Sequence, residues 1–126
     1  MQLLLLASAG GAIGAGLRFL VNEAFASRGL HAFPWATLTV NVAGCLAMGL
    51  LVGTFAERSH VSQELRVFLT TGVLGGFTTF SAFSMDFARL AEGGETGAAM
   101  AYAAASVILS ITAVFAGLWL SRTVLA

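Results

Sequence analysis

The sequence predicts an all-α membrane protein with four transmembrane helices per chain, the third of them broken near its middle. The chain has 126 residues, of which 58% are hydrophobic and only 10% charged, and its mean hydropathy is +0.90. Such a composition is typical of integral membrane proteins. Four apolar stretches have roughly the 20 residues that cross a bilayer. They cover residues 3–25, 35–55, 65–90 and 97–120, within one four-helix membrane domain, 1–126.

The first, second and fourth stretches are expected to form continuous helices. The first begins like a signal peptide, but it lacks a basic leading region and its apolar run continues past any cleavage point, so we expect it to be retained. Pro34 is expected to open the second helix, where a missing N–H costs least. Glycines four residues apart let membrane helices pack closely, and they occur at Gly10 and Gly14, Gly49 and Gly53, and Gly72 and Gly76.

The third stretch is interrupted by Gly75 and Gly76 and by a run of hydroxyl side chains that includes Thr78, Thr79 and Ser81. A break in a membrane helix exposes backbone polar groups away from water, so these groups need a cavity, an ion or a neighbouring chain. The helix that ends near Gly75 presents carbonyls suited to a cation, and the helix that restarts near Thr79 presents N–H groups suited to an anion. The break is therefore a candidate ion site, where carbonyls from two chains could form a cage for a monovalent cation.

The charges of the chain sum to zero, which gives no electrostatic reason to expect nucleic acid as a partner. With four spanning helices, three arginines lie on the side of both termini and three lie at or towards the other side. The first set is Arg58, Arg66 and Arg122, and the second is Arg18, Arg28 and Arg89. The positive-inside rule then favours neither orientation. We therefore predict an antiparallel, dual-topology homodimer, with a single orientation fixed by other features as the alternative.

Acidic and metal-ligating residues are sparse in the predicted helices. No Asp or Glu lies near the centre of the first, second or fourth stretch, which disfavours proton-coupled transport. Glu23 and Asp86 are expected to be interfacial charges, and His31 and His60 to lie at segment ends. Cys45, the only cysteine, is expected to be a small buried packing residue. The sequence has no metal-ligand cluster, no pairing of a nucleophile with a general base and no phosphate-binding loop, so we do not expect the protein to be an enzyme.

Neutral donors are the polar groups that remain inside the helices. Asn41 lies in the middle of the second stretch, with Thr37 one turn earlier. A polar stripe at i, i+4 and i+8 follows the fourth stretch at Tyr102, Ser106 and Ser110. These groups could line one path. Alternatively, Asn41 could bond a neighbouring helix, and the serines could bond the carbonyls of their own helix.

Phe80 and Phe83 are three residues apart and share one face of the helix that follows the break. Such a pair can be simple packing. Alternatively, the positive edges of the two rings can face an anion. With the neutral donors, the pair makes an anion path the favoured interpretation.

Three segments carry a family resemblance: GGAIGAGLRF at 10–19, TLTVNVAG at 37–44 and GGFTTFSAF at 75–83. They resemble the signature segments of the Fluc/CrcB fluoride channels, and the likeness covers nearly the whole chain in length, helix number and motif order. Ala82 departs from the family, which often carries threonine there. The resemblance implies a dual-topology antiparallel homodimer with two fluoride pores and a central structural sodium ion.

The resemblance also implies roles for individual residues. Arg18 matches a vestibule arginine, whose charge would draw anions in. The backbone carbonyls of Gly75 and Thr78 match the sodium ligands. The residues that match or extend the fluoride pore are Asn41, Phe80, Phe83, Ser81, Thr79, Tyr102, Ser106 and Ser110.

We therefore predict a fluoride-selective channel that lowers cytoplasmic fluoride by passive export, embedded in the lipid bilayer of a bacterial inner membrane. The alternative is a small dual-topology, proton-coupled multidrug exporter of similar length and helix count. That class needs a carboxylate at the heart of its first helix, and residues 9–17 contain none. A third possibility is a packing subunit without a pathway, in which the stripe and the break are only structural.

Overall fold

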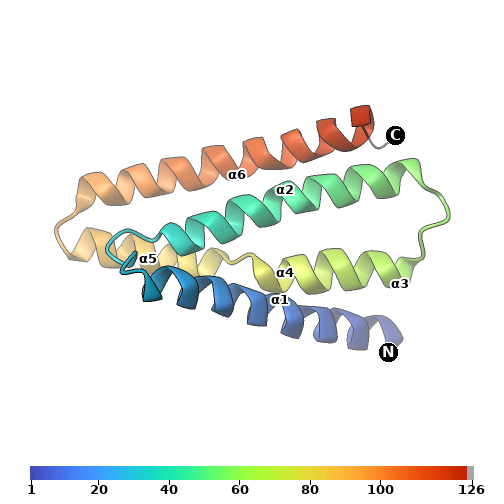
Figure 1. Cartoon of the computed structure of the whole chain (residues 1–126), viewed down its shortest axis with the longest axis horizontal. Coiled ribbons are helices and arrows are strands. Elements are labelled where there is room, and N and C mark those ends of the chain that lie inside the picture. The colour runs from blue at the N-terminus through green and yellow to red at the C-terminus, as the bar shows by residue number, and fades with distance from the viewer. Residues whose placement is uncertain (125–126) are drawn as a thin grey trace.

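Four helical rods lie side by side in the computed structural model, which describes residues 1–124 (Figure 1). Three of the rods are continuous helices: α1 (Gln2–Ser27), α2 (Trp35–Glu57) and α6 (Thr96–Val124). The helices extend up to four residues beyond the predicted ends, and α2 begins directly after Pro34. Within these residues, four helices are long and apolar enough to cross a membrane. Both ends of the described chain lie at the same end of the bundle, as an even number of crossings requires.

The third rod is assembled from several helical pieces. Before the break, three pieces follow one another without a gap: α3 (Gln63–Arg66), the π-helical segment η1 (Val67–Leu74) and α4 (Gly75–Phe77). After the break, the rod continues as α5 (Phe80–Glu92). The π-helical turns of η1 are wider than α-helical turns, and such turns are frequent at functional sites. They were not predicted from the sequence.

The break itself consists of Thr78 and Thr79. Both have extended backbones, with ψ angles of 155° and 124°. Thr79 caps the new helix, because its hydroxyl accepts a hydrogen bond from the N–H of Ala82 at 3.1 Å. The structure therefore confirms that the third helix is broken.

The paired glycines do not form the break, contrary to the expectation from the sequence. Gly75 has helical angles, with φ −62° and ψ −37°, and Gly76 lies within α4. A Cβ atom on Gly76 would collide with the backbone carbonyl of Gly11 in α1. Gly76 is thus needed for contact between helices, while the extended turn falls on threonines, whose branched side chains suit extended backbone.

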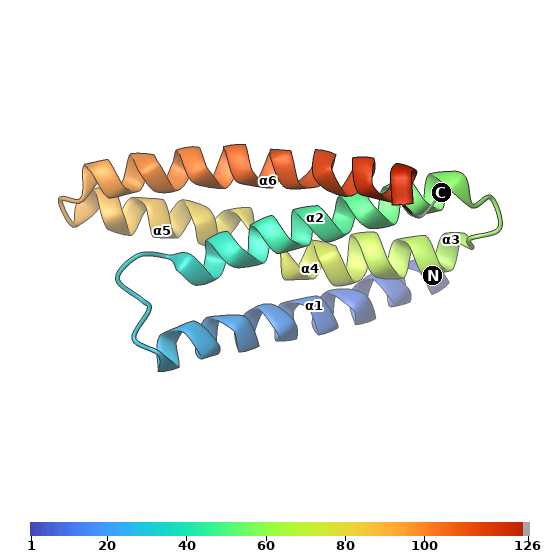
Figure 2. The same cartoon turned by 45° about the horizontal axis from the view of Figure 1, so that its top comes forward.

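The glycines spaced four residues apart lie at helix contacts, as predicted. A Cβ on Gly10 would lie 2.8 Å from the Cα of Gly72, and a Cβ on Gly49 of α2 would collide with the carbonyl of Val114 in α6. These approaches let backbones pack in lipid, where apolar side chains alone give little drive for association. Accordingly, α1 packs along η1 and α4, whereas α2 packs along α6 (Figure 2).

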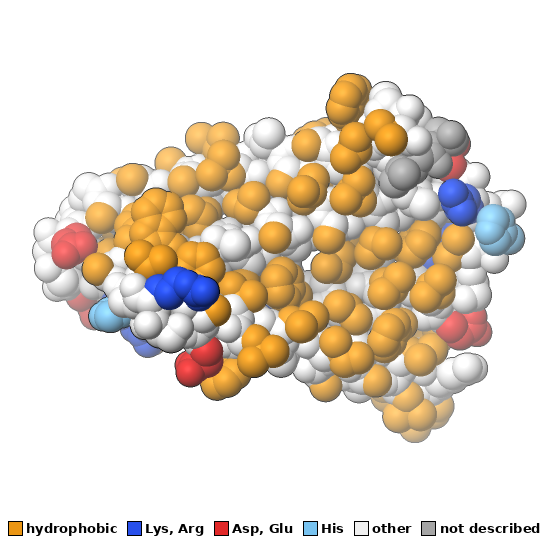
Figure 3. All heavy atoms as spheres, in the orientation of Figure 1, with side chains coloured by type: hydrophobic (Ala, Val, Ile, Leu, Met, Phe, Trp, Pro, Cys, Tyr) orange, Lys and Arg blue, Asp and Glu red, His pale blue; other side chains and the backbone are white. Residues whose placement is uncertain are grey.

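The face of the bundle seen in Figure 3 is largely apolar between two charged ends. Leu5, Phe19, Phe115 and Trp119 are each more than 60% exposed. A soluble monomer rarely presents so large an apolar surface, whereas lipid or another chain would cover it. The fully buried set is correspondingly small, and Tyr102 is its largest side chain.

Candidate functional site

A cavity of about 500 Å³ lies beside the break, and we call it the break cavity. It is bounded by α2, by both halves of the third rod and by α6. Among the described residues, its lining contains no Asp or Glu and consists of Asn41, Cys45, Gly75, Thr78, Thr79, Phe80, Phe83, Ser106, Val107, Ser110 and Ile111. Eight of these eleven residues were predicted from the sequence to line the pore or to bind sodium. The fold thus collects neutral donors and ring edges from three rods in one place.

The side chain of Asn41 holds the broken helix at Thr79. Its Nδ2 donates to the carbonyl of Thr79 at 3.0 Å, and its Oδ1 accepts from the N–H of Thr79 at 2.8 Å. The amide replaces the partners that Thr79 would have in a continuous helix, so these backbone groups are satisfied at membrane depth. A primary amide carries two hydrogens. Asn41 therefore bridges two helices and keeps one N–H for a ligand in the break cavity.

Two backbone carbonyls at the break lose the donors that a continuous helix would supply. Gly75 would accept from the N–H of Thr79 four residues later, but that N–H is donated to Asn41. Thr78 would accept from the N–H of Ala82, but that N–H is donated to the Thr79 hydroxyl. Both Gly75 and Thr78 line the break cavity. Because unwound carbonyls and the carbonyl ends of broken helices coordinate sodium in membrane proteins, these two residues fit a carbonyl-lined cation site.

Ser106 contributes a buried hydroxyl that has no hydrogen-bond partner among the described residues. The residue is 7% exposed and lines the break cavity. A helical Ser or Thr often bonds to the carbonyl four residues earlier, as Thr54 does with Leu50, but Ser106 does not. Buried polar groups in proteins are nearly always paired. This hydroxyl is therefore available to a ligand in the cavity.

Phe80 and Phe83 stand together at the start of α5, with ring centroids 5.4 Å apart and planes tilted by 54°. Phe80 is 77% exposed, so packing within the chain does not explain it. Phe83 is half-buried and its ring centroid lies 5.1 Å from that of Tyr102. Both phenylalanines line the break cavity.

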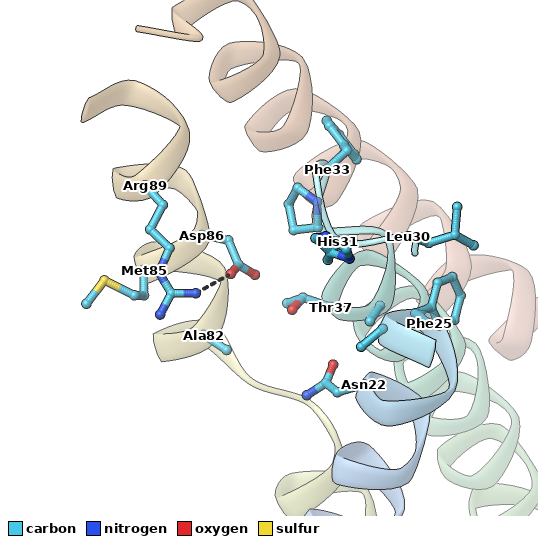
Figure 4. Close-up of a pocket in the computed structure, with 13 residues that line it drawn as sticks. Asn22, Phe25, Leu30, His31, Phe33, Thr37, Ala82, Met85, Asp86 and Arg89 are labelled. Carbon is cyan, nitrogen blue, oxygen red and sulfur yellow. Dashed lines mark ion pairs between the residues drawn. The ribbon is translucent and has the colours of Figure 1, made fainter. Parts of the chain in front are cut away.

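A second cavity, of about 370 Å³, lies near the end of the bundle where α1 ends and α2 begins, and we call it the end cavity (Figure 4). Asn22, Thr37 and Asp86 project towards it from α1, α2 and α5. Tyr102 is fully buried, and its hydroxyl donates to Oδ2 of Asp86 at 3.1 Å. Since Tyr102 also packs on Phe83, it lies between the two cavities. Only the serines of the predicted stripe reach the break cavity.

Asp86 accepts a hydrogen bond from Tyr102, a pairing that was not predicted from the sequence. Its side chain is 18% exposed, and its Oδ1 lies 4.0 Å from a guanidinium nitrogen of Arg89. The signal was available, because Phe83 and Asp86 are three residues apart and so share the face of α5 that meets Tyr102. Asp86 therefore belongs to the wall between the cavities.

Arg18 lies at the level of the break and outside the linings of both cavities. Its Nε donates to the carbonyl of Gly76 at 3.2 Å. Arg18 is therefore not an end charge. Without it, three arginines remain at the end that holds both termini and two at the other: Arg58, Arg66 and Arg122 against Arg28 and Arg89.

Two further residues differ from expectation. Ser81, predicted to line the pore, lies outside the break cavity, and its hydroxyl is 3.2 Å from that of Thr79. Cys45 was expected to be a buried packing residue, but it is half-buried and lines the break cavity. Its spacing was the missed signal, because Cys45 follows Asn41 by one helical turn and so lies on the same face.

The sequence of the chain matches a known protein family and several known proteins over most of its length. The family described as "CrcB-like protein, Camphor Resistance (CrcB)" matches residues 5–118. The fluoride-specific ion channel FluC of Chelativorans sp. (strain BNC1) is 58% identical over 99% of this chain and 100% of its own. Proteins of the same name from Rhodospirillum centenum (strain ATCC 51521 / SW) and Rhizobium meliloti (strain 1021) are each 52% identical, over 100% and 97% of this chain and 100% and 98% of theirs. These matches confirm the resemblance found in the sequence: the chain is a multi-pass membrane protein and belongs to the CrcB family.

Proposed function

We propose that this protein is a fluoride-selective channel through which fluoride leaves the cytoplasm passively. The break cavity is the observation that carries the proposal. It combines neutral donors from α2 and α6, a buried hydroxyl without a described partner, and a described lining free of Asp and Glu. Relatives that are 52% to 58% identical over nearly the whole chain bear the name of a fluoride-specific ion channel.

The chemistry of the cavity suits a small, strongly hydrated anion. A pore must replace the hydrogen bonds that water gives to such an ion. The spare N–H of Asn41 and the hydroxyls of Ser106 and Ser110 can supply them, and the ring edges of Phe80 and Phe83 add weak positive charge. Because all these groups are neutral, the ion can be bound without being trapped.

The family argues against the multidrug exporter and against an enzyme. Its relatives are named as ion channels. Proton coupling also requires an intramembrane carboxylate that can exchange protons with the transport path. Asp86 is the acidic residue nearest to the break along the chain, yet it faces the end cavity and accepts a hydrogen bond from Tyr102.

We propose that the working unit is an antiparallel homodimer with two pores. Phe80 and Ile111 of the break cavity are 77% and 55% exposed in a single chain, so one chain leaves the cavity uncovered on that side. A second copy would complete the wall. The three and two arginines at the two ends differ by a single residue, which gives little preference for one orientation.

We further propose that a structural sodium ion lies between the two copies. The carbonyls of Gly75 and Thr78 support this ion site, because both have lost the donors of a continuous helix. Both residues also line the side of the break cavity that the second copy would cover. When bound, the ion would neutralise the negative ends of the two broken helices. The bacterial inner membrane, the lipid bilayer of the relatives' cells, is the proposed location.

The test of the function is fluoride efflux from liposomes that contain the purified protein, followed with a fluoride electrode. We expect fast efflux when potassium leaves with the ion through an ionophore, without any pH gradient. Chloride-loaded vesicles serve as the selectivity control, and empty vesicles as the leak control. Efflux that requires a proton gradient, or that is equal for chloride, would refute a selective passive channel.

The orientation is tested with a single reporter cysteine. Cys45→Ala supplies the cysteine-free background, and Ser59→Cys places a thiol in the loop between α2 and α3. We expect an impermeant reagent to label this loop from both faces of the membrane. Labelling from one face alone would eliminate dual topology and leave the single-orientation alternative.

A further inference from the structure

Arg18 is a cation in the middle of the bundle that the proposed ion path does not use. Among residues 1–124 the only ion pair within 4.0 Å joins Arg89 to Asp86, so no described carboxylate balances Arg18. Its guanidinium instead meets the carbonyl of Gly76, in the last turn before the break. A cation at the carbonyl end of a helix is stabilising, most of all where it is partly buried. A charged side chain at membrane depth normally has a specific role.

The position of Arg18 is fixed by the contact between α1 and the first half of the broken rod. A Cβ on Gly72 would lie 2.9 Å from the Cα of Gly10, and Gly14 and Gly76 face backbone atoms of the other helix just as closely. These backbones touch, so α1 and the segment 63–77 form one rigid pair. The side chain of Arg18 therefore reaches the break from a fixed base.

The two halves of the break are held by different helices. Arg18 of α1 binds the carbonyl of Gly76 on one side, and Asn41 of α2 binds both backbone groups of Thr79 on the other. In a continuous helix, Gly76 would accept from the N–H of Phe80, which the extended backbone at Thr78 and Thr79 prevents. The guanidinium supplies the replacement donor.

We propose that Arg18 is a positioning residue that sets the geometry of the break through its hydrogen bond to Gly76, and that it does not act by drawing anions in. By holding the Gly76 peptide, Arg18 fixes the direction of the neighbouring Gly75 and Thr78 carbonyls and the start of α5 at Phe80. The conduction effect of this role rests on the proposed channel function. The structural effect can be measured without any transport.

The two roles make opposite predictions for a lysine at this position. Arg18→Lys keeps the positive charge but has a methylene group where arginine has Nε, so the observed hydrogen bond is lost. Arg18→Gln removes the charge. If the residue steers anions, the lysine variant behaves like the parent, and the glutamine variant loses flux mainly at low ionic strength, where charge acts furthest. If it positions the break, both variants are impaired at every ionic strength.

Hydrogen–deuterium exchange in detergent, read on peptides covering 75–83, is the primary measurement. We expect exchange in both Arg18 variants to be faster by roughly tenfold, the loss of one charge-assisted hydrogen bond. Peptides from α2 and α6 should stay at parental rates. Arg28→Gln is the matched control, because Arg28 directly follows α1 at the end of the bundle and its side chain, among the described residues, donates to the nearby carbonyl of Ala24 alone. Its exchange at 75–83 should be parental.

Fluoride efflux at low and high ionic strength is the second measurement. We expect both Arg18 variants to lose the saturating rate in parallel at the two ionic strengths. A lysine variant with parental exchange and flux would overturn the proposal, and so would faster exchange spread over all helices, which would make Arg18 a general packing residue. If the parent itself conducts no fluoride, the proposed function fails, while the exchange measurement still decides the role of Arg18.

Discussion

The side-chain amide of Asn41 and the backbone of Thr79 form a two-way hydrogen-bonded pair, at 3.0 Å from Nδ2 to the carbonyl and 2.8 Å from the N–H to Oδ1. The pair joins α2 to the break across 38 positions of sequence. The same amide lines the break cavity. Interhelical bonding and ion contact, which the sequence presented as alternatives for Asn41, are thus compatible in one side chain.

Asn41→Asp tests this double role. At neutral pH the carboxylate can still accept from the N–H of Thr79, but it faces the Thr79 carbonyl without a proton and places a negative charge beside the anion path. Repulsion at low dielectric should reduce fluoride flux by at least about tenfold, measured in liposomes. The protonated acid can repeat both hydrogen bonds, so flux above the leak of empty vesicles should partly return at mildly acidic pH. A variant that conducts like the parent at neutral pH would show that the pore does not pass Asn41.

Phe80→Ile and Phe83→Ile separate ring chemistry from packing. Phe80 is 77% exposed, so its replacement should change the free energy of unfolding by no more than about 0.5 kcal/mol. Phe83 packs on Tyr102, and its replacement should cost more, up to about 1.5 kcal/mol. We nevertheless expect both variants, and the methionine variants, to lose most fluoride flux while eluting as the parent does. Unchanged flux in all of them would mean that the rings act only as bulk.

Ser106→Ala should separate stability from conduction. The parental hydroxyl is buried without a partner among the described residues, so its removal should leave thermal stability unchanged or raise it slightly. Fluoride flux should fall by a few-fold, since neighbouring donors or water can partly substitute. Ser110→Ala, on the same cavity wall, is the companion variant. Reduced stability with parental flux would assign Ser106 to packing.

Cys45 offers a chemical probe of the break cavity. It is the only cysteine of the chain, is half-buried and lines the cavity one turn from Asn41. We expect a small methanethiosulfonate to form a mixed disulfide with this thiol and to block fluoride efflux. Cys45→Ala should conduct and be insensitive to the reagent. If the reagent labels the parent, as mass spectrometry can verify, and flux is unaffected, the cavity is not on the ion path.

Gly14→Ala tests the contact between α1 and η1. An added Cβ at Gly14 would collide with the carbonyl of Val73, whereas a Cβ at Gly16 meets nothing within 4 Å. Overpacking of this kind should lower the unfolding free energy by about 1–3 kcal/mol, measured by denaturation in detergent micelles. Gly16→Ala, two positions away on the same helix, should be neutral. Equal stability of the two variants would contradict the close approach of the backbones.

The rods and the break could be predicted from the sequence because both follow from composition along the chain. Hydropathy and length alone mark four spans, and a cluster of glycines and hydroxyls marks an interruption. The position of the interruption could not be predicted, because Gly75 and Gly76 have two possible uses. Only the neighbouring backbone of Gly11 shows that Gly76 is needed for contact between helices.

Site residues that share one face of a single helix could be predicted from their spacing. Contacts between side chains of different helices could not. The spacing of Phe80 and Phe83, and of Ser106 and Ser110, gives faces that the structure brings to one cavity. The partners of Asn41, Arg18 and Tyr102 lie 38, 58 and 16 positions away. Such pairings depend on the rotation and depth of each helix in the bundle, which periodicity does not specify.

The π-helical turns of η1 determine the rotation of the residues that follow them in the third rod. Each residue of an α-helix turns the chain by about 100°. In a segment with wider turns, each residue turns the chain by less, so the side chains after the segment point in different directions around the helix axis. Tightening η1 to an α-helix with all eight of its residues kept would turn the chain further at each residue, and so rotate Gly75 away from the break cavity and Gly76 away from Arg18. The width of these turns is therefore as much a part of the site as the residues that line it.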